Sequence, residues 1–382
     1  MKYLFTCGGT AGHINPALAV ASQLKSLLPS CEILFIGADG QMETELVPRE
    51  GYEIRTVTIT NISRGHSIDD VKHNAETVKN VLVSSAKARK IIREFAPDAV
   101  IGTGGYVCFP VLSAAHELHI PTLLHESNAS PGLTTRLLSR TVDRIIVGYE
   151  SSIANYPEPS KVKAAGTPVR LEFSEFSKES AKSGLGVDVS EPLVLSVWGS
   201  LGAAHMNGIM LDMIRHICRD GVSPRFHLIH ATGKRYYTEF MDAINKDCPD
   251  YPEHGIEIRE YINDMPKVMT ASDVVLCRAG ASTLSELTYM GKPSVLVPSP
   301  NVTENHQEKN ARAIEKAGGA IVFLENEFDA VSLLQKIQAL IADENGLKKM
   351  SDCAAKLSVR NSAQVIAEEI ISLAQNHAAM IK

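Results

Sequence analysis

Aromatic side chains and excess positive charge are both scarce in this chain of 382 residues. Only 5% of the residues are aromatic, a single one is tryptophan, and the formal net charge is -6. Proteins that bind nucleic acid usually present basic surfaces, and those that bind single strands add aromatic stacking platforms. We therefore expect no nucleic-acid partner.

Metal-binding and disulfide patterns are also missing. The seven cysteines include no C-x-x-C pair, so their spacing indicates neither a disulfide framework nor a zinc site and fits a reducing cytoplasm. The Asp-x-Asp motif that holds a metal on the diphosphate of many sugar donors is absent, as are the P-loop and G-x-S-x-G patterns. We expect a protein without a metal or another cofactor.

No run is apolar and long enough to suggest a membrane span. The longest uncharged run, 99–115, is interrupted by Gly104-Gly105 and Pro110, and it is shorter than the roughly 20 apolar residues that a span requires. The first residues contain one lysine and then reach Gly8-Gly9, which leaves no room for the apolar part of a secretory signal.

Short β-rich runs alternate with helical stretches along the whole chain. In the first half we predict strands at 3–7, 32–36, 99–102, 122–124 and 144–147, and helices that include 16–28 and 80–95. The second half repeats this plan, with predicted strands at 193–197, 226–230, 256–259, 274–277 and 294–297 and a final helix at 362–377. The alternation predicts an α/β protein with two parallel-sheet domains. Ligands of such sheets bind beyond the carboxyl ends of the strands, so we expect the strand-to-helix loops to face a cleft.

The first strand-to-helix loop is Gly8-Gly9-Thr10-Ala11-Gly12-His13. Glycines there allow backbone N–H groups to approach a polar ligand. The run does not contain the dinucleotide pattern G-x-G-x-x-G, which lowers the prospect of a nicotinamide cofactor. A tight turn without a ligand is the alternative. His13 could act as a base near neutral pH or cap the helix.

Two further glycine-rich turns follow predicted strands. Gly104-Gly105-Tyr106 lies in the first half, and Trp198-Gly199-Ser200-Leu201-Gly202 lies in the second. Such turns supply backbone donors suited to diphosphates. Each one alone could instead be a packing device.

The segment from Cys277 to Glu286 links a strand to a helix that should stop at Gly291. Thr283 and Glu286 have the spacing of a capping box, in which Glu286 would satisfy helix N-terminal donors. The alternative is that Glu286 accepts hydrogen bonds from two ribose hydroxyls. The spacing does not decide between them.

The segment 72–94 carries six basic residues against two glutamates, in a chain that is otherwise acidic. Apolar residues recur in it at helical spacing, namely Val78, Val81, Leu82, Ile91, Ile92 and Phe95. One interpretation is a helix whose apolar face lies in the core; the other is a surface that docks on anionic lipid.

Taken together these residues resemble the MurG family of peptidoglycan glycosyltransferases over nearly the whole chain. The motifs that carry the resemblance are the first loop, Gly104 to Val107, His125 to Asn128, Thr167 to Arg170, Gly199 to Ala203, Tyr261 to Met265, Arg278 to Glu286 and His306 to Ala311. Three positions depart from the family pattern. Trp198 and Leu201 stand where the third loop usually has Gly and Gln, and Thr167 replaces the usual Asn.

The resemblance implies a GT-B fold, with an N-terminal acceptor and membrane-side domain at 1–166 joined by the last helix, about 362–382, and a UDP-sugar-binding domain at 167–361. Within that fold we expect His13 to be the general base or a close organiser of it, with Glu126 as the second catalytic residue on the acceptor side. Gly104, Gly105 and Tyr106 would hold the acceptor diphosphate. The donor-binding positions that the resemblance implies are Thr10, Ala11, Gly12, Asn128, Arg170, Ser200, Ile262, Ala281, Ser282, Thr283, Leu284, Ser285, Glu286 and Gln307. Glu286 would hold the ribose, while a capping role could coexist.

The reaction that the resemblance implies is an inverting transfer of N-acetylglucosamine from UDP-N-acetylglucosamine to an undecaprenyl-linked muramyl-pentapeptide lipid. UDP-N-acetylglucosamine is then a substrate and not a cofactor. The enzyme would lie on the cytoplasmic face of the cell membrane, with other cell-wall enzymes as further partners. Rival interpretations are a diacylglycerol glycosyltransferase, a sugar-nucleotide 2-epimerase and an inactive UDP-sugar-binding subunit.

Overall fold

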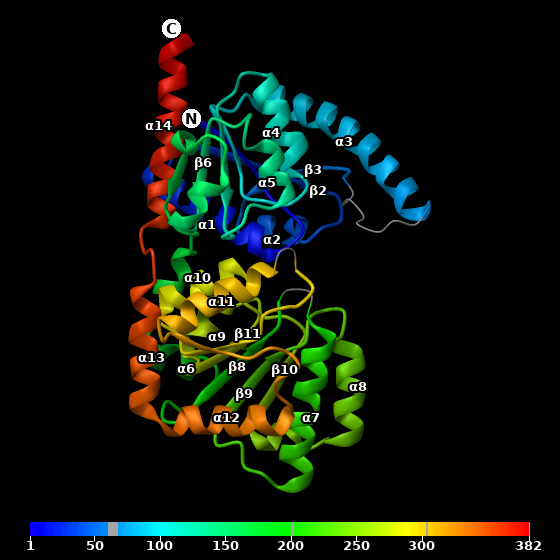
Figure 1. Ribbon diagram of the computed structural model, residues 1–382, viewed down its shortest axis with the longest axis vertical. Helices are drawn as coiled ribbons and strands as arrows, with labels where there is room; N and C mark the ends of the chain where they lie inside the picture. The colour runs from blue at the N-terminus through cyan, green and yellow to red at the C-terminus, as the bar shows by residue number, and fades with distance from the viewer. Residues whose placement is uncertain (60–67, 200–201, 303–304, 382) are drawn as a thin grey trace. The chain divides into compact units, whose positions relative to one another are not determined.

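The computed structural model describes residues 1–59, 68–199, 202–302 and 305–381 (Figure 1). It divides into two compact units. Unit 1 comprises residues 1–170 together with 359–382, and unit 2 comprises residues 171–358. Ser200 and Leu201 of the third glycine-rich turn lie outside the described residues.

Unit 1 is built on a parallel sheet of seven strands in the order β3-β2-β1-β4-β5-β6-β7. Most of these strands are continuous apolar runs, as expected for a parallel sheet covered on both faces. Their bounds are β1 Lys2–Thr6, β2 Glu32–Ala38, β3 Glu53–Val57, β4 Ala99–Gly102, β5 Thr122–Glu126, β6 Arg144–Val147 and β7 Val162–Ala164. The helices are α1 Ala11–Leu27, α2 Glu43–Arg49, α3 Ile68–Phe95, α4 Cys108–Glu117, α5 Leu133–Leu138 and the short 3-10 helices η1 Glu150–Asn155 and η2 Pro159–Lys161.

The last helix of the chain, α14 (Ser362–Ile381), belongs to unit 1 and lies beside α1 (Figure 1). Its buried face contributes Ile366, Ala367 and Ile370 to the same apolar core as Ile14 and Leu24 of α1. The chain therefore returns to its first unit after completing the second.

Unit 2 repeats the plan with a parallel sheet of six strands in the order β10-β9-β8-β11-β12-β13. The strand bounds are β8 Leu193–Val197, β9 His227–Ala231, β10 Ile256–Arg259, β11 Val274–Cys277, β12 Ser294–Leu296 and β13 Ala320–Val322. Its helices are η3 Leu171–Ser174, α6 Lys178–Ser183, α7 Ala204–Asp220, α8 Tyr237–Asp247, η4 Tyr251–His254, α9 Met265–Ala271, α10 Ala281–Met290, α11 His306–Lys316, α12 Ala330–Ala342 and α13 Glu344–Lys356. The predicted α/β fold with two parallel-sheet domains is confirmed.

Helix α3 is the main surprise in unit 1, because it begins at Ile68 and not near Asn80 as the pattern predicted. Ile91 and Ile92 are buried, in agreement with an inward apolar face, but the side chain of Leu82 is 69% exposed. Within the described residues, no helix combines the length and the apolar character that a membrane crossing requires.

Candidate active site

The first loop turns β1 directly into α1, with Thr10 in an extended conformation before the helix begins at Ala11. His13 lies in the first turn, and its Nδ1 is 3.0 Å from the carbonyl oxygen of Gly8. A carbonyl oxygen can only accept, so Nδ1 carries the hydrogen of the neutral ring and Nε2 keeps its lone pair. The loop thus favours the tautomer with its hydrogen on Nδ1, in which Nε2 is able to accept a proton.

The second loop supports the same ring from β4. A Cβ atom on Gly104 would lie 2.5 Å from His13 Cδ2 and 3.0 Å from His13 Nε2, so the ring packs directly against the Gly104 backbone. A Cβ on Gly105 would lie 2.4 Å from the carbonyl oxygen of Gly8. Both glycines also have positive φ, at 117° and 91°. Only glycine fits these two positions, because a side chain would displace the first loop.

Tyr106 follows these glycines and is 40% exposed, just before α4 begins at Cys108. The N–H groups in the first turn of a helix have no partner inside the helix, and the helix dipole favours an anion there. The Gly104 N–H points to Cys108 Sγ at 3.3 Å. The N–H groups of Cys108 and Phe109 donate to the carbonyl oxygens of Gly105 and Tyr106, each at 3.2 Å. The donors best placed for a diphosphate are therefore those of residues 105–107.

Glu126 ends β5 and accepts four hydrogen bonds. Its Oε1 takes the backbone N–H of Asn128 at 3.0 Å and the Asn128 side-chain amide at 2.9 Å. Its Oε2 takes Gly132 N–H at 3.1 Å and the Thr135 hydroxyl at 2.7 Å. With the residue 7% exposed and both oxygens occupied, this carboxylate orders the loop between β5 and α5. The arrangement suits an organiser of the site better than a second proton acceptor.

Arg170 lies at the end of the chain segment that completes unit 1. Its Nη1 is 3.4 Å from Glu50 Oε1, and the guanidinium side chain is 14% exposed. His125, one strand position before Glu126, is buried and its Nε2 lies 3.1 Å from the carbonyl oxygen of Gly166. Burial lowers the pKa of His125, so this ring is neutral and structural.

In unit 2, α10 begins at Ala281 with Gly280 as its N-cap residue. Of the two alternatives for Glu286, the capping box does not fit, because Thr283 lies inside the first turn and cannot be the N-cap of a helix that starts two residues earlier. Glu286 lies in the second turn and is 7% exposed. The helix ends before Gly291, whose φ is 60°, as predicted.

The first turn of α10 contains the predicted donor positions Ala281, Ser282, Thr283, Leu284 and Ser285. A Cβ placed on Gly280 would meet nothing nearer than the Thr283 hydroxyl at 4.0 Å, so the approach to the helix start is open. The Leu284 side chain is buried in the core, which leaves the backbone as its means of contact. The Ser285 hydroxyl donates to the Ala281 carbonyl oxygen at 3.0 Å. The turn therefore presents backbone N–H groups and the hydroxyl side chains of Ser282 and Thr283 at the start of the helix.

Arg278 holds neighbouring strand ends of this sheet together. Its Nη1 donates to the carbonyl oxygens of Val297 at 3.1 Å and Pro298 at 3.3 Å, and its Nη2 donates to Glu325. These partners follow β12 and β13. The Arg278 guanidinium therefore has a structural role, because its hydrogen bonds link the loops that follow β12 and β13.

The structure also shows the contacts or the burial of two other residues that are predicted to bind the UDP-sugar. The side-chain oxygen of Gln307, in the first turn of α11, accepts the Ser299 N–H at 2.9 Å, which fixes the amide and leaves its NH2 group to donate. Ile262, between β10 and α9, is 3% exposed. A contact from Ile262 to a ligand would therefore come from its backbone.

Trp198, which departs from the family pattern, is 2% exposed and belongs to the apolar core of unit 2, alongside Met206 and Met210 of α7. Its ring does not occupy the loop surface. Its indole N–H is buried without a hydrogen-bond partner among the described residues.

The thiols beside these loops are not nucleophiles. Burial raises the pKa of Cys108 to about 12 and raises those of Cys7 and Cys277 as well. A thiol of this kind stays protonated at neutral pH and is unreactive.

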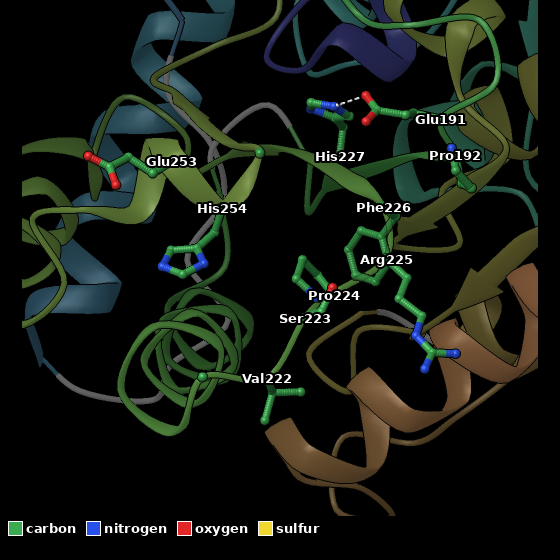
Figure 2. Close-up of a pocket in the computed structure, with 12 residues that line it drawn as sticks. Glu191, Pro192, Val222, Ser223, Pro224, Arg225, Phe226, His227, Glu253 and His254 are labelled. Carbon is green, nitrogen blue, oxygen red and sulfur yellow. Dashed lines mark hydrogen bonds and ion pairs between the residues drawn. The ribbon is translucent and has the colours of Figure 1, made fainter.

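Two features lie in unit 2 away from the strand carboxyl ends. A pocket of about 540 Å³ lies at the amino ends of β8, β9 and β10, where Glu191 pairs with His227 and Arg225, in the preceding loop, is part of the lining (Figure 2). Near it, ligand atoms of Cys218, Asp250 and His254 lie within 4.8 Å of one another, a proximity that the sequence spacing did not indicate. None of the predicted site residues lines this pocket.

Sequence reasoning missed one residue of the first loop's environment. Glu43, at the start of α2, is fully buried and touches the Gly8-Gly9 segment. Nothing in the sequence pattern connects these positions, because the contact joins residues far apart in the chain.

Comparison with known proteins agrees with this geometry. Residues 3–147 match the glycosyltransferase family 28 N-terminal domain, and residues 193–368 match the family 28 C-terminal domain. A UDP-N-acetylglucosamine--N-acetylmuramyl-(pentapeptide) pyrophosphoryl-undecaprenol N-acetylglucosamine transferase from Acetivibrio thermocellus is 43% identical over 379 residues, which cover 99% of this chain and 100% of that protein.

Two solved structures share the architecture. MurG from Acinetobacter baumannii superposes with a TM-score of 0.68 at 25% identity, covering 97% of this chain and 99% of that one. A UDP-GlcNAc 2-epimerase from Neisseria meningitidis gives a TM-score of 0.68 at 16% identity, covering 97% and 100%, and shows the fold alone.

Two parallel-sheet units with glycine-rich loops at the strand ends, matched to the family 28 domains, define a glycosyltransferase of the GT-B class. Given its 43% identity over nearly the full length, the chain belongs to the MurG family of N-acetylglucosamine transferases.

Proposed function

We propose that the protein transfers N-acetylglucosamine from UDP-N-acetylglucosamine to the C4 hydroxyl of the undecaprenyl-linked muramyl-pentapeptide, releasing UDP. The acceptor oxygen forms a bond to the anomeric carbon as the bond from that carbon to the diphosphate breaks. The leaving group keeps the electron pair, and one displacement gives the β-linked disaccharide. The full-length similarity to transferases named for this reaction is the observation that carries the proposal.

His13 is our choice for the base that takes the proton of the C4 hydroxyl. The hydrogen bond from Nδ1 to the Gly8 carbonyl supports this role, because it leaves the Nε2 lone pair to accept. Glu126 then assists by ordering Asn128 and the loop that follows.

The acceptor's own diphosphate would bind at Gly105 and Tyr106, with Gly104 providing the close approach. The start of α4 supports this assignment through the positive end of the helix dipole and not through its own N–H groups, because those of Cys108 and Phe109 donate to the carbonyl oxygens of Gly105 and Tyr106 and Pro110 has none.

The UDP-sugar would bind chiefly to unit 2. Glu286 would accept from the ribose hydroxyls, the backbone after Ile262 would contact the uracil, and the NH2 group of Gln307 would reach the sugar. Thr10, Ala11, Gly12, Asn128, Arg170 and Ser200 would complete the donor contacts.

The leaving diphosphate would be stabilised without a metal. The open start of α10 supports this, because a helix N-terminus aims its N–H groups and its positive dipole end at an incoming anion. Residues 278–285 include no carboxylate side chain, whereas a divalent metal on a diphosphate is usually held by one or two carboxylates.

The protein would bind to the cytoplasmic face of the cell membrane, where its lipid acceptor lies. Helices α3 and α5, which both pack on α4, expose four large apolar side chains, those of Leu82, Val83, Leu133 and Leu137. Exposed cations on the same helices include Lys87, Lys90, Arg93 and Arg136, and Arg140 follows just after α5. Apolar and basic groups together are what a peripheral protein presents to anionic lipid. The side chains of Lys72 and Lys79 lie outside the described residues. Other cell-wall enzymes would meet the protein at that membrane.

Product analysis with three reactions tests the proposal. UDP-N-acetylglucosamine is incubated with a short-chain muramyl-lipid, with diacylglycerol, or with no acceptor, and the products are identified by mass spectrometry. We expect a disaccharide-lipid only in the first reaction. Diacylglycerol carrying N-acetylglucosamine would indicate a different lipid transferase, and an epimerised sugar nucleotide without acceptor would indicate an epimerase. Donor binding without any product would indicate a binding subunit.

A further inference from the structure

A buried carboxylate lies directly behind the first loop. Glu43 is fully buried at the start of α2. Its Oε2 accepts the Gly9 N–H at 3.0 Å, and its Oε1 accepts the Ala38 N–H at 2.8 Å. Both partners are donors, so the group serves as a two-oxygen acceptor, which is the form a carboxylate provides.

The sequence around Glu43 is built to admit this side chain. A Cβ on Gly8 would lie 2.3 Å from Glu43 Oε1, and a Cβ on Gly37 would lie 2.5 Å from Glu43 Cγ. Contacts this short do not occur between real atoms, so any larger residue at either position would expel the carboxylate. The two glycines therefore reserve the space that it fills.

The Gly9 N–H and the Gly8 carbonyl belong to one peptide unit, and they point to opposite sides of it because the bond is trans. On one side the N–H donates to Glu43, and on the other the carbonyl accepts from His13 Nδ1 at 3.0 Å. Hydrogen bonds in such a chain polarise one another. The negative charge on Glu43 thus makes the Gly8 oxygen a stronger acceptor for the imidazole hydrogen.

We propose that Glu43 is a positioning residue that acts on His13 through the Gly8–Gly9 peptide. It does for this histidine what an orienting carboxylate does for the base of a hydrolase, holding the tautomer and stabilising the imidazolium that forms when Nε2 takes a proton. It differs in that a peptide unit lies between the two side chains. The inference rests on the proposed role of His13 as the base.

The variant Glu43→Gln removes the charge and keeps the side-chain volume. A glutamine offers one oxygen and one NH2 group to two N–H donors, so one of the two bonds is lost. We expect kcat to fall about tenfold, the usual difference between a charge-assisted and a neutral hydrogen bond. The KM for UDP-N-acetylglucosamine should stay within about twofold, a change worth well under 1 kcal/mol. Glu45→Gln, an exposed change in the same helix, is the matched control and should keep wild-type kcat.

A spectroscopic measurement separates this inference from the activity and from any folding defect. Histidine labelled with 15N reports the tautomer of each ring, and the His13 signals are identified by their loss in His13→Gln. We expect the Nδ1–H tautomer in the wild-type protein and mixed tautomers in Glu43→Gln. A wild-type His13 protonated at Nε2 when neutral would overturn the inference, whether or not any variant folds.

The two proposals fail differently. An unchanged tautomer and unchanged kcat in a folded Glu43→Gln protein would overturn the role of Glu43 while leaving the transferase assignment intact. A wild-type protein with the Nδ1–H tautomer but no transfer activity would overturn the transferase assignment. It would leave intact the hydrogen-bond chain from Glu43 through the Gly8–Gly9 peptide to His13.

Discussion

Substitution of Gly104 by alanine should displace the His13 ring. The new Cβ would lie 2.5 Å from His13 Cδ2, whereas carbon atoms in contact lie about 3.5–4.0 Å apart. The ring must therefore move by roughly 1 Å, a displacement that can lower a catalytic rate by about a hundredfold when it affects a reacting group. We expect kcat to fall by that order. The KM for UDP-N-acetylglucosamine should change little, because the proposed donor contacts lie mostly in unit 2.

Backbone strain must be separated from this displacement. Gly104 has a φ of 117°, where an alanine costs on the order of 1–2 kcal/mol of stability whatever surrounds it. Gly51→Ala is the matched control, because Gly51 has a φ of 80° and a Cβ there meets nothing within 4 Å. In urea, Gly51→Ala should lose only the free energy of the backbone strain, and Gly104→Ala should lose at least as much because it adds the contact with the ring.

Only Gly104→Ala should lose activity, measured as radiolabelled sugar transferred to a muramyl-lipid acceptor. A folded Gly104→Ala protein with wild-type kcat would refute the placement of His13 against this glycine. Equal losses of kcat in both variants would show that strain, and not contact with the ring, determines the rate.

Two further predictions concern unit 2. Replacing Glu286 with alanine should weaken UDP-N-acetylglucosamine binding about tenfold to a hundredfold in calorimetry, the loss typical of hydrogen bonds to a charged group; unchanged affinity would exclude the ribose role. Burial lowers the pKa of His230 to about 3, below its ordinary value of about 6.5, so the unfolded chain binds a proton first as the pH falls. The free energy of unfolding should therefore decrease between about pH 6.5 and pH 3, by at most about 1.4 kcal/mol per pH unit from this group. Urea titrations of the wild type and His230→Gln should differ in that slope, and identical slopes would contradict a buried neutral ring.

The central strands could be predicted from the sequence because they are continuous apolar runs, such as Leu193 to Val197 in β8. The edge strand β3 was missed because Glu53 and Arg55 break its apolar pattern, and β7 and β13 have only three residues each. The start of α10 at Ala281 could not be read from the sequence, because the capping-box spacing of Thr283 and Glu286 is compatible with a later N-cap than Gly280. Backbone conformation, and not side-chain spacing, decides where that helix begins.

The candidate loops were predictable because glycine-rich segments between strands and helices mark the functional edge of a parallel sheet. Their internal contacts were not. Glu43 reaches Gly9 across 34 positions of the chain. Three of the four donors to Glu126 come from the loop after β5 and the fourth, the Thr135 hydroxyl, comes from α5, and the sequence does not specify the path that brings them together. Long-range hydrogen bonds of this kind depend on how the strands are ordered. The strand order, with β1 between β2 and β4, brings the three elements around His13 together.

The most direct test of the account is transfer of radiolabelled N-acetylglucosamine from UDP-N-acetylglucosamine to a short-chain muramyl-lipid in excess chelator, with wild-type protein and His13→Ala. We predict that the wild type forms the labelled disaccharide-lipid at the same rate with and without chelator. His13→Ala should bind the donor normally and transfer label far more slowly. Loss of wild-type activity in chelator would contradict the metal-free mechanism, and full activity of His13→Ala would contradict the role of His13 as the base.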